Sequence, residues 1–530
     1  MKQSVKTILS GIAKATGGIA SILLGIKILG FVEKLIMARF FGTGYQAEAY
    51  FLAFGLMITF WDILRGLMAP SYLPTLLEYR TQCGEAQSWE FTSTVLNLMT
   101  LIFAALTGIG LIFTPQIVRL VSDNLSEQAF LTTVGLTRLM LTGAGFFALA
   151  IITGLTLNSY KRFMLAVMDD VVFKVSGLLG LILLGRYVGI YGLAWGIALG
   201  SWIAPFLHLV GLRKYVAHYT FRIDMTSSAF KKMMRLIQPL IVGTVCIEGR
   251  RVIDNRFASK FPGSVSALAY GYKLIEFAYV FIAEPLAVVV LPYFSELAIK
   301  NDRDTLADTL FTSLRTVILL FTPMGVCLFM LRYPVVKMLF ERGAFDSDST
   351  QLTVVALAFY AFGIVGFAVE ALLMRTYYSL SDTRTPALME VFTLTVHVGL
   401  IFRLRASLAH GAIALAFTLS KTLKALVLYG LLKRRLGTIQ FAENLRFFGK
   451  LLIATGGMLS MMWGYQYWFD GQFSGDAIST QAALIVSSGA LGAGIFCVLT
   501  FWLNIEEVRF VFSACVRYAS QKLSGHQGRS

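Results

Sequence analysis

Charged side chains recur inside the long apolar segments of this 530-residue chain. A charge at the centre of a bilayer costs roughly 2.5–3.5 kcal/mol, so charges in such segments face a cavity or pair with a partner. They occur in five segments, as Lys27, Glu33 and Lys34; Glu48, Asp62 and Arg65; Asp169, Asp170 and Lys174; Glu248, Arg250, Arg251, Asp254 and Arg256; and Lys273, Glu276 and Glu284. These residues are the candidates for chemistry in an otherwise apolar sequence.

Helical spacing indicates what some of these charges could do. Lys27 and Lys34 are seven residues apart and share a helix face, as do Lys273 and Glu284, which are eleven apart. Lys27 and Lys273 lie in different halves of the chain, where they would line a central cavity from both sides. Cations that face a cavity suit an anionic substrate, and phosphate is the commonest such group.

Ion pairing that holds helices together is the alternative. Asp170 and Lys174 have the i,i+4 spacing of a helical ion pair, and the charges between 248 and 256 could pair in the same way. Weighing both, we predict one set of substrate-binding residues, which is Lys27, Lys34, Glu48, Arg65, Asp254, Lys273 and Glu276. No catalytic or metal-binding residue is predicted.

Motifs of energy conversion and catalysis are absent from the sequence. It has no G-x-x-x-x-G-K-[ST] phosphate loop, no H-E-x-x-H and no G-x-S-x-G. We therefore expect a transporter rather than an enzyme, without a cofactor, and leave open its coupling to an ion gradient or to the membrane potential.

The segments that position these charges are expected to be membrane-spanning helices. Apolar residues make up 56% of the chain, charged residues only 14%, and the mean hydropathy is +0.70. Each span needs about 20 apolar residues whose backbone groups bond within the segment, which predicts an all-α integral membrane protein. About fourteen spans are expected, at 9–38, 46–77, 90–114, 134–159, 166–186, 189–212, 235–259, 264–295, 311–339, 350–378, 385–404, 410–432, 445–468 and 478–504.

Lysine and arginine are concentrated in alternate loops, which indicates that both termini are cytoplasmic. The formal net charge of +16 is explained by these loops, and no nucleic-acid partner is expected.

A weak internal repeat at an offset of about 219 residues divides the chain. Leu73-Pro74 recurs as Leu291-Pro292, Pro115 as Pro334, and Gly192 as Gly411. The repeat holds six helices, an even number, so its two copies have the same orientation in the membrane and predict two parallel lobes around a cavity. We expect a first lobe at 1–215, a second at 216–438, two additional helices at 439–508 and a cytoplasmic tail at 509–530.

Several strings resemble the MurJ/MviN lipid II flippase family over nearly the whole chain. The most specific are residues 339–345, LFERGAF, and 382–386, DTRTP. Others are ARFFG at 38–42, YLPTLLEY at 72–79, LNSYKRF at 157–163, GSVS at 263–266 with KLIEF at 273–277, and His410-Gly411.

The resemblance implies the MOP exporter fold with fourteen helices, in the cytoplasmic membrane of a bacterium. It also implies that an undecaprenyl-diphosphate-linked saccharide, foremost the peptidoglycan precursor lipid II, is flipped from the inner to the outer leaflet by alternating access. The implied partners are this lipid-linked saccharide, membrane lipids and enzymes of cell-envelope synthesis.

The sequence departs from the family pattern at its intramembrane cations. Lys27 and Lys273 stand where the family carries arginine, and Trp61-Asp62 roughly replaces an Arg-Arg pair. Arginine and lysine are not interchangeable where a phosphate is bound bidentately. Another lipid-linked oligosaccharide, such as an exopolysaccharide or O-antigen unit, is therefore an alternative substrate. A cation-coupled small-molecule exporter of the MATE type is a further alternative, favoured by Asp169, Asp170 and Glu284.

Overall fold

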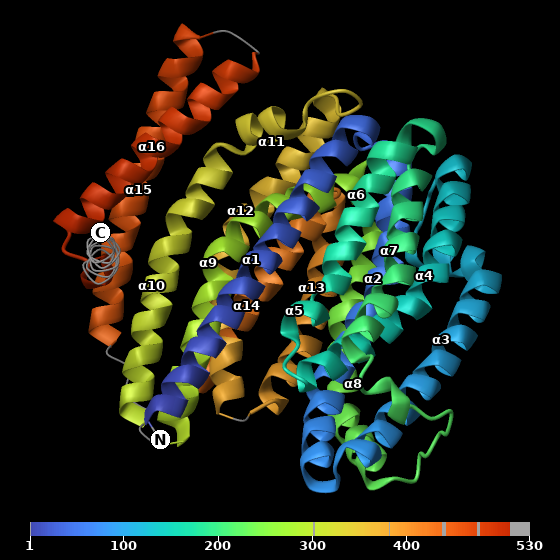
Figure 1. Cartoon of the computed structure of the whole chain (residues 1–530). Coiled ribbons are helices and arrows are strands. Elements are labelled where there is room, and N and C mark those ends of the chain that lie inside the picture. The colour runs from blue at the N-terminus through green and yellow to red at the C-terminus, as the bar shows by residue number, and fades with distance from the viewer. Residues whose placement is uncertain (1, 300–302, 381, 437–440, 474–476, 509–530) are drawn as a thin grey trace, which may run out of the picture. The chain divides into compact units, whose positions relative to one another are not determined.

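The computed structural model describes residues 2–299, 303–380, 382–436, 441–473 and 477–508, and every regular element in these residues is a helix (Figure 1). The first eight are α1 (Lys2–Phe41), α2 (Tyr45–Cys83), α3 (Glu85–Val121), α4 (Glu127–Ser159), α5 (Phe163–Ala166), α6 (Met168–Val188), α7 (Tyr191–Leu212) and α8 (Ser228–Ala258), with the 3-10 helix η1 (Val216–His218) before α8. The others are α9 (Ser264–Ile299), α10 (Arg303–Met330), α11 (Arg332–Phe340), α12 (Ser347–Ser379), α13 (Arg384–Leu408), α14 (Gly411–Leu436), α15 (Phe441–Gln472) and α16 (Ile478–Trp502). The predicted all-α membrane class is confirmed.

Each of the predicted spans contains a long helix. Within the described residues, ten helices are long and apolar enough to cross a membrane. The exact count of fourteen spans stays a prediction.

One predicted span is wrong, because it is two helices and not one. The segment at 311–339 divides into α10 and α11, which meet at Leu331. Pro334 is the third residue of α11. It therefore lies in the first helical turn, where a residue without a backbone N–H is tolerated. The position of this proline therefore favours a new helix start over a continuous span.

The chain forms two compact units, which we describe separately. The first comprises Met1–Ala269 together with Arg342–Ser349, and the second comprises Tyr270–Glu341 together with Thr350–Ser530. Because α8 packs against α2 and α3, it belongs to the first unit. The lobe boundaries inferred from the repeat stay a prediction, and the predicted tail at 509–530 lies outside the described residues.

The first unit is built around α2, α4, α6 and α7. The Trp61 ring on α2 stacks on Phe147 of α4 with centroids 3.9 Å apart and meets Phe173 of α6 edge-on at 5.0 Å. Trp61 is only 2% exposed. Trp61 is thus a core aromatic residue of the first unit.

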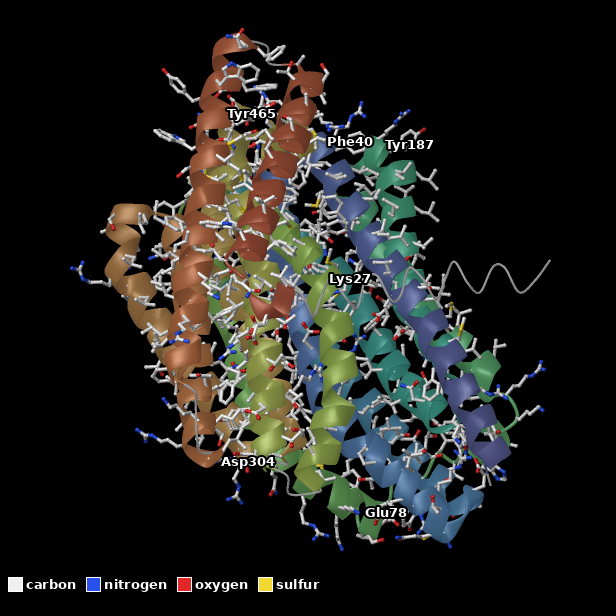
Figure 2. The ribbon with its side chains drawn as sticks, turned by 90° about the vertical axis from the view of Figure 1, so that its left-hand side faces the viewer. Lys27, Phe40, Glu78, Tyr187, Asp304 and Tyr465 are labelled. Atoms are coloured by element: carbon white, nitrogen blue, oxygen red, sulfur yellow. The ribbon has the colours of Figure 1, made fainter. Side chains whose placement is uncertain are left out.

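At one end of the first unit, two loops pack on helix ends that are distant in the sequence. The Ala344 N–H donates to the Arg39 carbonyl at the end of α1 (2.9 Å). In the corresponding way, the Asp123 N–H donates to the Ser259 hydroxyl at the end of α8 (2.7 Å). We call these two pairings the end-loop contacts. Phe40 and Tyr187 mark this end of the unit, and Glu78 lies at the other end (Figure 2).

Two glycines permit the first end-loop contact, and their replacement tests it. Gly42 has φ 55°, and a Cβ there would lie 2.2 Å from the Ala344 carbonyl oxygen. Gly343 has φ 65°, and its Cβ would lie 2.3 Å from the Arg39 carbonyl oxygen. We expect Gly42→Ala and Gly343→Ala each to destabilise the protein by more than about 1 kcal/mol, seen as a lower thermal unfolding midpoint in detergent.

Gly25→Ala is the matched control, because a Cβ at Gly25 meets nothing within 4 Å and the residue lies inside α1. Helix propensity favours alanine there, so its midpoint should stay unchanged or rise. Equal midpoints for Gly25→Ala and Gly42→Ala would contradict the close packing of this contact.

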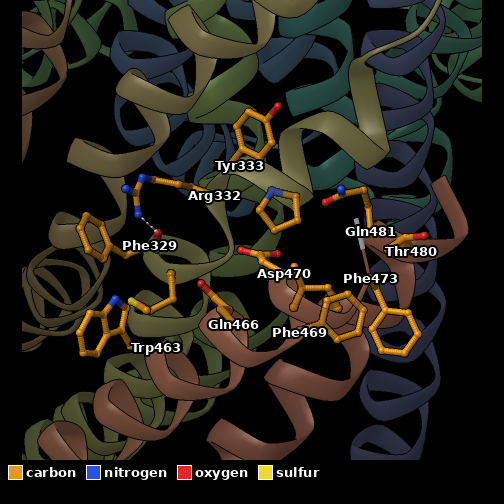
Figure 3. Close-up of a pocket in the computed structure, with 13 residues that line it drawn as sticks. Phe329, Arg332, Tyr333, Trp463, Gln466, Phe469, Asp470, Phe473, Thr480 and Gln481 are labelled. Carbon is orange, nitrogen blue, oxygen red and sulfur yellow. Dashed lines mark hydrogen bonds between the residues drawn. The ribbon is translucent and has the colours of Figure 1, made fainter. Parts of the chain in front are cut away.

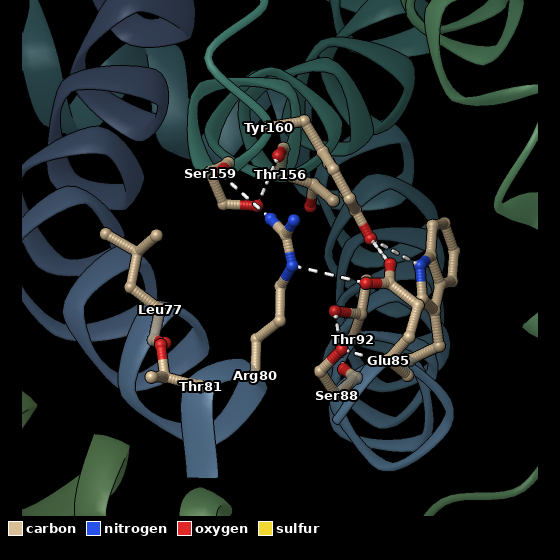
Figure 4. Close-up of polar contacts among 10 residues, drawn as sticks. Leu77, Arg80, Thr81, Glu85, Ser88, Thr92, Thr156, Ser159 and Tyr160 are labelled. Carbon is tan, nitrogen blue, oxygen red and sulfur yellow. Dashed lines mark hydrogen bonds and ion pairs between the residues drawn. The ribbon is translucent and has the colours of Figure 1, made fainter. Parts of the chain in front are cut away.

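At the opposite end of the first unit, Arg80 joins the ends of three helices (Figure 4). Its guanidinium donates to the Ser159 carbonyl (3.0 Å), pairs with Glu85 (3.2 Å) and lies 4.1 Å from the centroid of the Tyr160 ring. The Tyr160 hydroxyl donates to Glu85 and accepts from the Trp89 indole N–H. Burial and this bond to Glu85 raise the pKa of Tyr160. The LNSYKRF string thus supplies a structural turn.

The second unit contains α10 to α16 and most of α9. Its α13 and α14 pack together, and the additional helices α15 and α16 pack on each other and on α10 and α11. Asp382 caps α13 by accepting from the N–H and the hydroxyl of Thr385, and Arg435 at the end of α14 donates to it. Burial alone would raise the pKa of Asp382, but these donors hold it below its usual value.

Candidate substrate-binding site

Ion pairs within and between helices connect most of the intramembrane charges of the first unit. We call this group the polar belt. Its members are Glu33 and Lys34 on α1, Asp62 and Arg65 on α2, Asp170 and Lys174 on α6, and Glu248, Arg250, Arg251 and Asp254 on α8.

Glu33 is the most buried member of the polar belt, with 1% of its surface exposed. Its carboxylate pairs with Lys34 at 2.6 Å and with Lys174 at 3.2 Å, and it accepts from the Tyr50 hydroxyl at 3.4 Å. The Lys34 ammonium also lies 4.7 Å from the centroid of the Tyr50 ring. Lys34 therefore serves helix packing in this structure, and its predicted contact with substrate stays a prediction.

Asp170 and Lys174 do form ion pairs that hold helices together, but with other helices rather than with each other at the i,i+4 spacing. Lys174 pairs instead with Glu33 on α1, and Asp170 pairs with Arg65 on α2 at 3.3 Å. Because α6 packs against α1, the ammonium finds a buried carboxylate on another helix. The Arg65 and Asp170 side chains are 45% and 33% exposed.

Arg251 joins α8 to α2. It pairs with Asp62 at 3.1 Å and with Glu248 at 3.2 Å, while Arg250 pairs with Asp254 at 3.1 Å. The side chains of Arg251 and Asp62 are about one third exposed. Charges at membrane depth do not face lipid, so this exposure indicates a water-accessible surface on the first unit. The predicted site residues Arg65 and Asp254 both belong to the polar belt.

The other predicted site residues are placed differently. Glu48 is buried and accepts from the Val265 N–H at 3.3 Å, which places its negative charge at the N-terminus of α9. Lys27 is partly exposed in the middle part of α1 (Figure 2). Lys273 and Glu276 form an ion pair of 2.8 Å within α9. Lys27 and Lys273 lie in different units, so the cavity that both would line stays a prediction.

A second buried charge cluster, in the second unit, was missed by the sequence analysis. The Lys424 ammonium on α14 is fully buried, lies 2.6 Å from Glu370 on α12 and also pairs with Glu390 on α13. Lys421 pairs with Glu370 at 2.8 Å. These residues are also charges inside apolar segments, so the criterion that selected the other candidates would have selected them too.

Metal binding finds no support in the described residues, where no group of three or more His, Cys, Asp or Glu could hold an ion. The predicted candidate Glu284 has a side chain outside the described part of the structure.

Long apolar helices define a polytopic membrane protein, and a partly exposed belt of ion pairs inside it is typical of a transporter. The family model described as lipid II flippase MurJ matches residues 37–481, and the chain belongs to this family. Its relatives include the lipid II flippase MurJ of Burkholderia cenocepacia, with 24% identity over 90% of this chain and 95% of that protein.

Solved structures show the same fold. A lipid II flippase MurJ in an inward closed conformation has a TM-score of 0.75 and 22% identity, covering 90% of this chain and 98% of that one. An inward-facing multidrug resistance MATE transporter of the MOP superfamily has a TM-score of 0.69 and 13% identity, covering 78% and 94%. The predicted MOP fold and the predicted class of transporter rather than enzyme are confirmed.

Proposed function

We propose that this protein flips lipid II across the cytoplasmic membrane of a bacterium by alternating access. The observation that carries the proposal is the family match over residues 37–481, which includes every helix of the polar belt except the part of α1 before residue 37. The MATE fold alone would also allow a small-molecule exporter, but the family match favours the lipid-linked substrate.

The polar belt supplies chemistry that suits a diphosphate. Arg65 and Arg251 are partly exposed, and a guanidinium can hold two phosphate oxygens at once. Their carboxylate partners Asp170 and Asp62 hold the guanidinium groups in place before the substrate arrives. Lys27 and Lys273 would add a cation from each unit, and the prenyl tail would stay in the lipid.

Alternating access would also require contacts at one end of the transporter to open. The end-loop contacts lie where the extracytoplasmic loops are expected, with both termini in the cytoplasm. They are hydrogen bonds of backbone and hydroxyl groups, accompanied by an ion pair of 3.3 Å between Lys260 and Asp123, and all of these contacts can break and re-form. A charge that crosses 100 mV gains about 2.3 kcal/mol, so the membrane potential or an ion gradient could drive the cycle.

Rescue of a bacterial strain depleted of its own lipid II flippase tests the proposed substrate. We expect growth, together with lipid II that becomes accessible at the outer leaflet. Normal membrane insertion without growth would reject lipid II as the substrate and favour another lipid-linked oligosaccharide.

Loss of either candidate cavity cation should abolish this rescue. We expect Lys27→Ala and Lys273→Ala each to stop growth while expression is retained, because each removes a cation that the diphosphate would contact. Lys214→Ala, in an exposed loop, is the matched control and should grow normally. Full growth of both test variants would reject the assignment of these two lysines to the substrate.

A further inference from the structure

The second unit contains a pocket of about 670 Å³ between the α10–α11 junction and the α15–α16 hairpin (Figure 3). Its walls carry Arg332, Trp463, Gln466, Asp470 and Gln481, together with several phenylalanines. This volume lies within the range of small-molecule sites, and the lining combines aromatic rings with several polar groups. None of these residues belongs to the polar belt.

Two opposite charges line this pocket from different helices. Among the described residues, neither Arg332 of α11 nor Asp470 of α15 forms an ion pair. Arg332 donates to the Phe329 carbonyl at 2.6 Å and lies 4.5 Å from the centroid of the Phe329 ring, which fixes the orientation of its guanidinium. A guanidinium has five N–H donors, so most of them are available to a ligand.

Gln466 adds a buried amide to the same wall. Its Nε2 atom is buried and has no hydrogen-bond partner in the described part of the chain. Buried polar atoms are normally hydrogen-bonded, and an orphaned donor in a pocket wall marks a place for an acceptor on a ligand.

The aromatic residues of α15 indicate the depth of the pocket in the membrane. Trp463, Tyr465, Tyr467 and Trp468 are crowded into the last turns of α15, and the Trp463 and Tyr467 side chains are largely exposed. Tyr465 lies near this end of the helix, and Asp304 lies at the other end of the same unit (Figure 2). Tryptophan and tyrosine concentrate at the level of the lipid headgroups. The pocket therefore opens where phospholipid headgroups are present.

We propose that this pocket binds the zwitterionic headgroup of a phospholipid of the phosphatidylethanolamine class. Arg332 would bind the phosphate, and Asp470 would bind the ammonium, with an aromatic face nearby. One cation and one anion give no net charge. A prenyl diphosphate carries more negative charge and would find only one cation, Arg332, in this pocket. Asp470 would also repel it, so the pocket suits a zwitterion better. The bound lipid would join α15–α16 to α10–α11, separately from the substrate site.

Lipid binding to the purified full-length protein tests the proposal. Retained lipid is measured by native mass spectrometry in detergent with added phosphatidylethanolamine or phosphatidylglycerol. We expect phosphatidylethanolamine to bind about tenfold more tightly, since only its ammonium can pair with Asp470. Asp470→Asn should abolish this preference, and Arg332→Gln should weaken both lipids about tenfold. D470K should reverse the preference in favour of phosphatidylglycerol.

Asp304→Asn and Arg403→Gln are matched controls, because both residues are exposed and lie outside the pocket. Their lipid preference should equal that of the unchanged protein. Unfolding midpoints without added lipid show whether each variant is folded, and the reversal by D470K is a gain that misfolding cannot produce. Equal binding of the two lipids, an unchanged preference in D470K, or tighter binding of a prenyl diphosphate at this pocket would overturn the proposal.

Discussion

Replacement of Lys424 by methionine is expected to destabilise the protein by about 3–5 kcal/mol. The ammonium is fully buried between Glu370 and Glu390, so its removal leaves two carboxylates close together without their shared cation. Lys421 would neutralise only one of them. The expected readout is a large loss of the folded fraction after purification and a much lower thermal unfolding midpoint.

A triple variant separates the charge effect from the loss of packing. Adding Glu370→Gln and Glu390→Gln to Lys424→Met removes the stranded charges, so most of the lost stability should return. Lys421→Met is the matched single control, and its effect should be smaller because its ammonium is more exposed and has one partner. If Lys424→Met and Lys421→Met behave alike, Lys424 is not the residue that holds this cluster together.

Reversal of the charge at Arg65 is expected to abolish rescue of the flippase-depleted strain. R65E would place a carboxylate beside Asp170 and would remove a guanidinium that we assign to the diphosphate. Arg65→Lys keeps the charge but loses the bidentate geometry, so it should support slow growth. Growth of the depleted strain, with membrane levels of each variant measured alongside, is the readout.

The exchanged pair R65E with D170R distinguishes substrate binding from helix pairing. The exchange restores an ion pair between α2 and α6, so the thermal unfolding midpoint should recover. Rescue should not recover, because the guanidinium would then project from α6. Full growth of the exchanged variant would show that Arg65 acts only by pairing with Asp170.

The helices were predictable from sequence because membrane insertion depends on local hydropathy. The partners of the charges were not, since they depend on which helices pack together. The spacing of Asp170 and Lys174 predicts a pair within one helix, but the packing of α6 against α1 brings Glu33 to Lys174. Likewise, the sequence did not indicate that Glu48 accepts a hydrogen bond from the Val265 N–H at the start of α9.

The strings that revealed the family have mainly structural roles in this chain. Gly343 needs a positive φ in its turn, and Asp382 caps α13. Such positions accept few residue types, so they remain recognisable in a distant relative. The charges inside the helices depend instead on which helices pack together, and Trp61 beside Asp62 packs in the aromatic core of the first unit. Family membership was thus easier to predict than the binding residues.

The end-loop contacts also bear on how the protein is made. The first unit is completed by residues 342–349, which follow about 80 residues after Ala269 along the chain. Ala344 follows Arg39 by about 300 residues, so at a synthesis rate of about 5–20 residues per second the end of α1 waits roughly 15–60 s for the loop that packs on it. During that interval the Arg39 carbonyl lacks its native donor, and the newly inserted helices stay open to insertase or chaperone contact. A ribosome that stalls after Ala269 but before Arg342 would hold the first unit in this incomplete state.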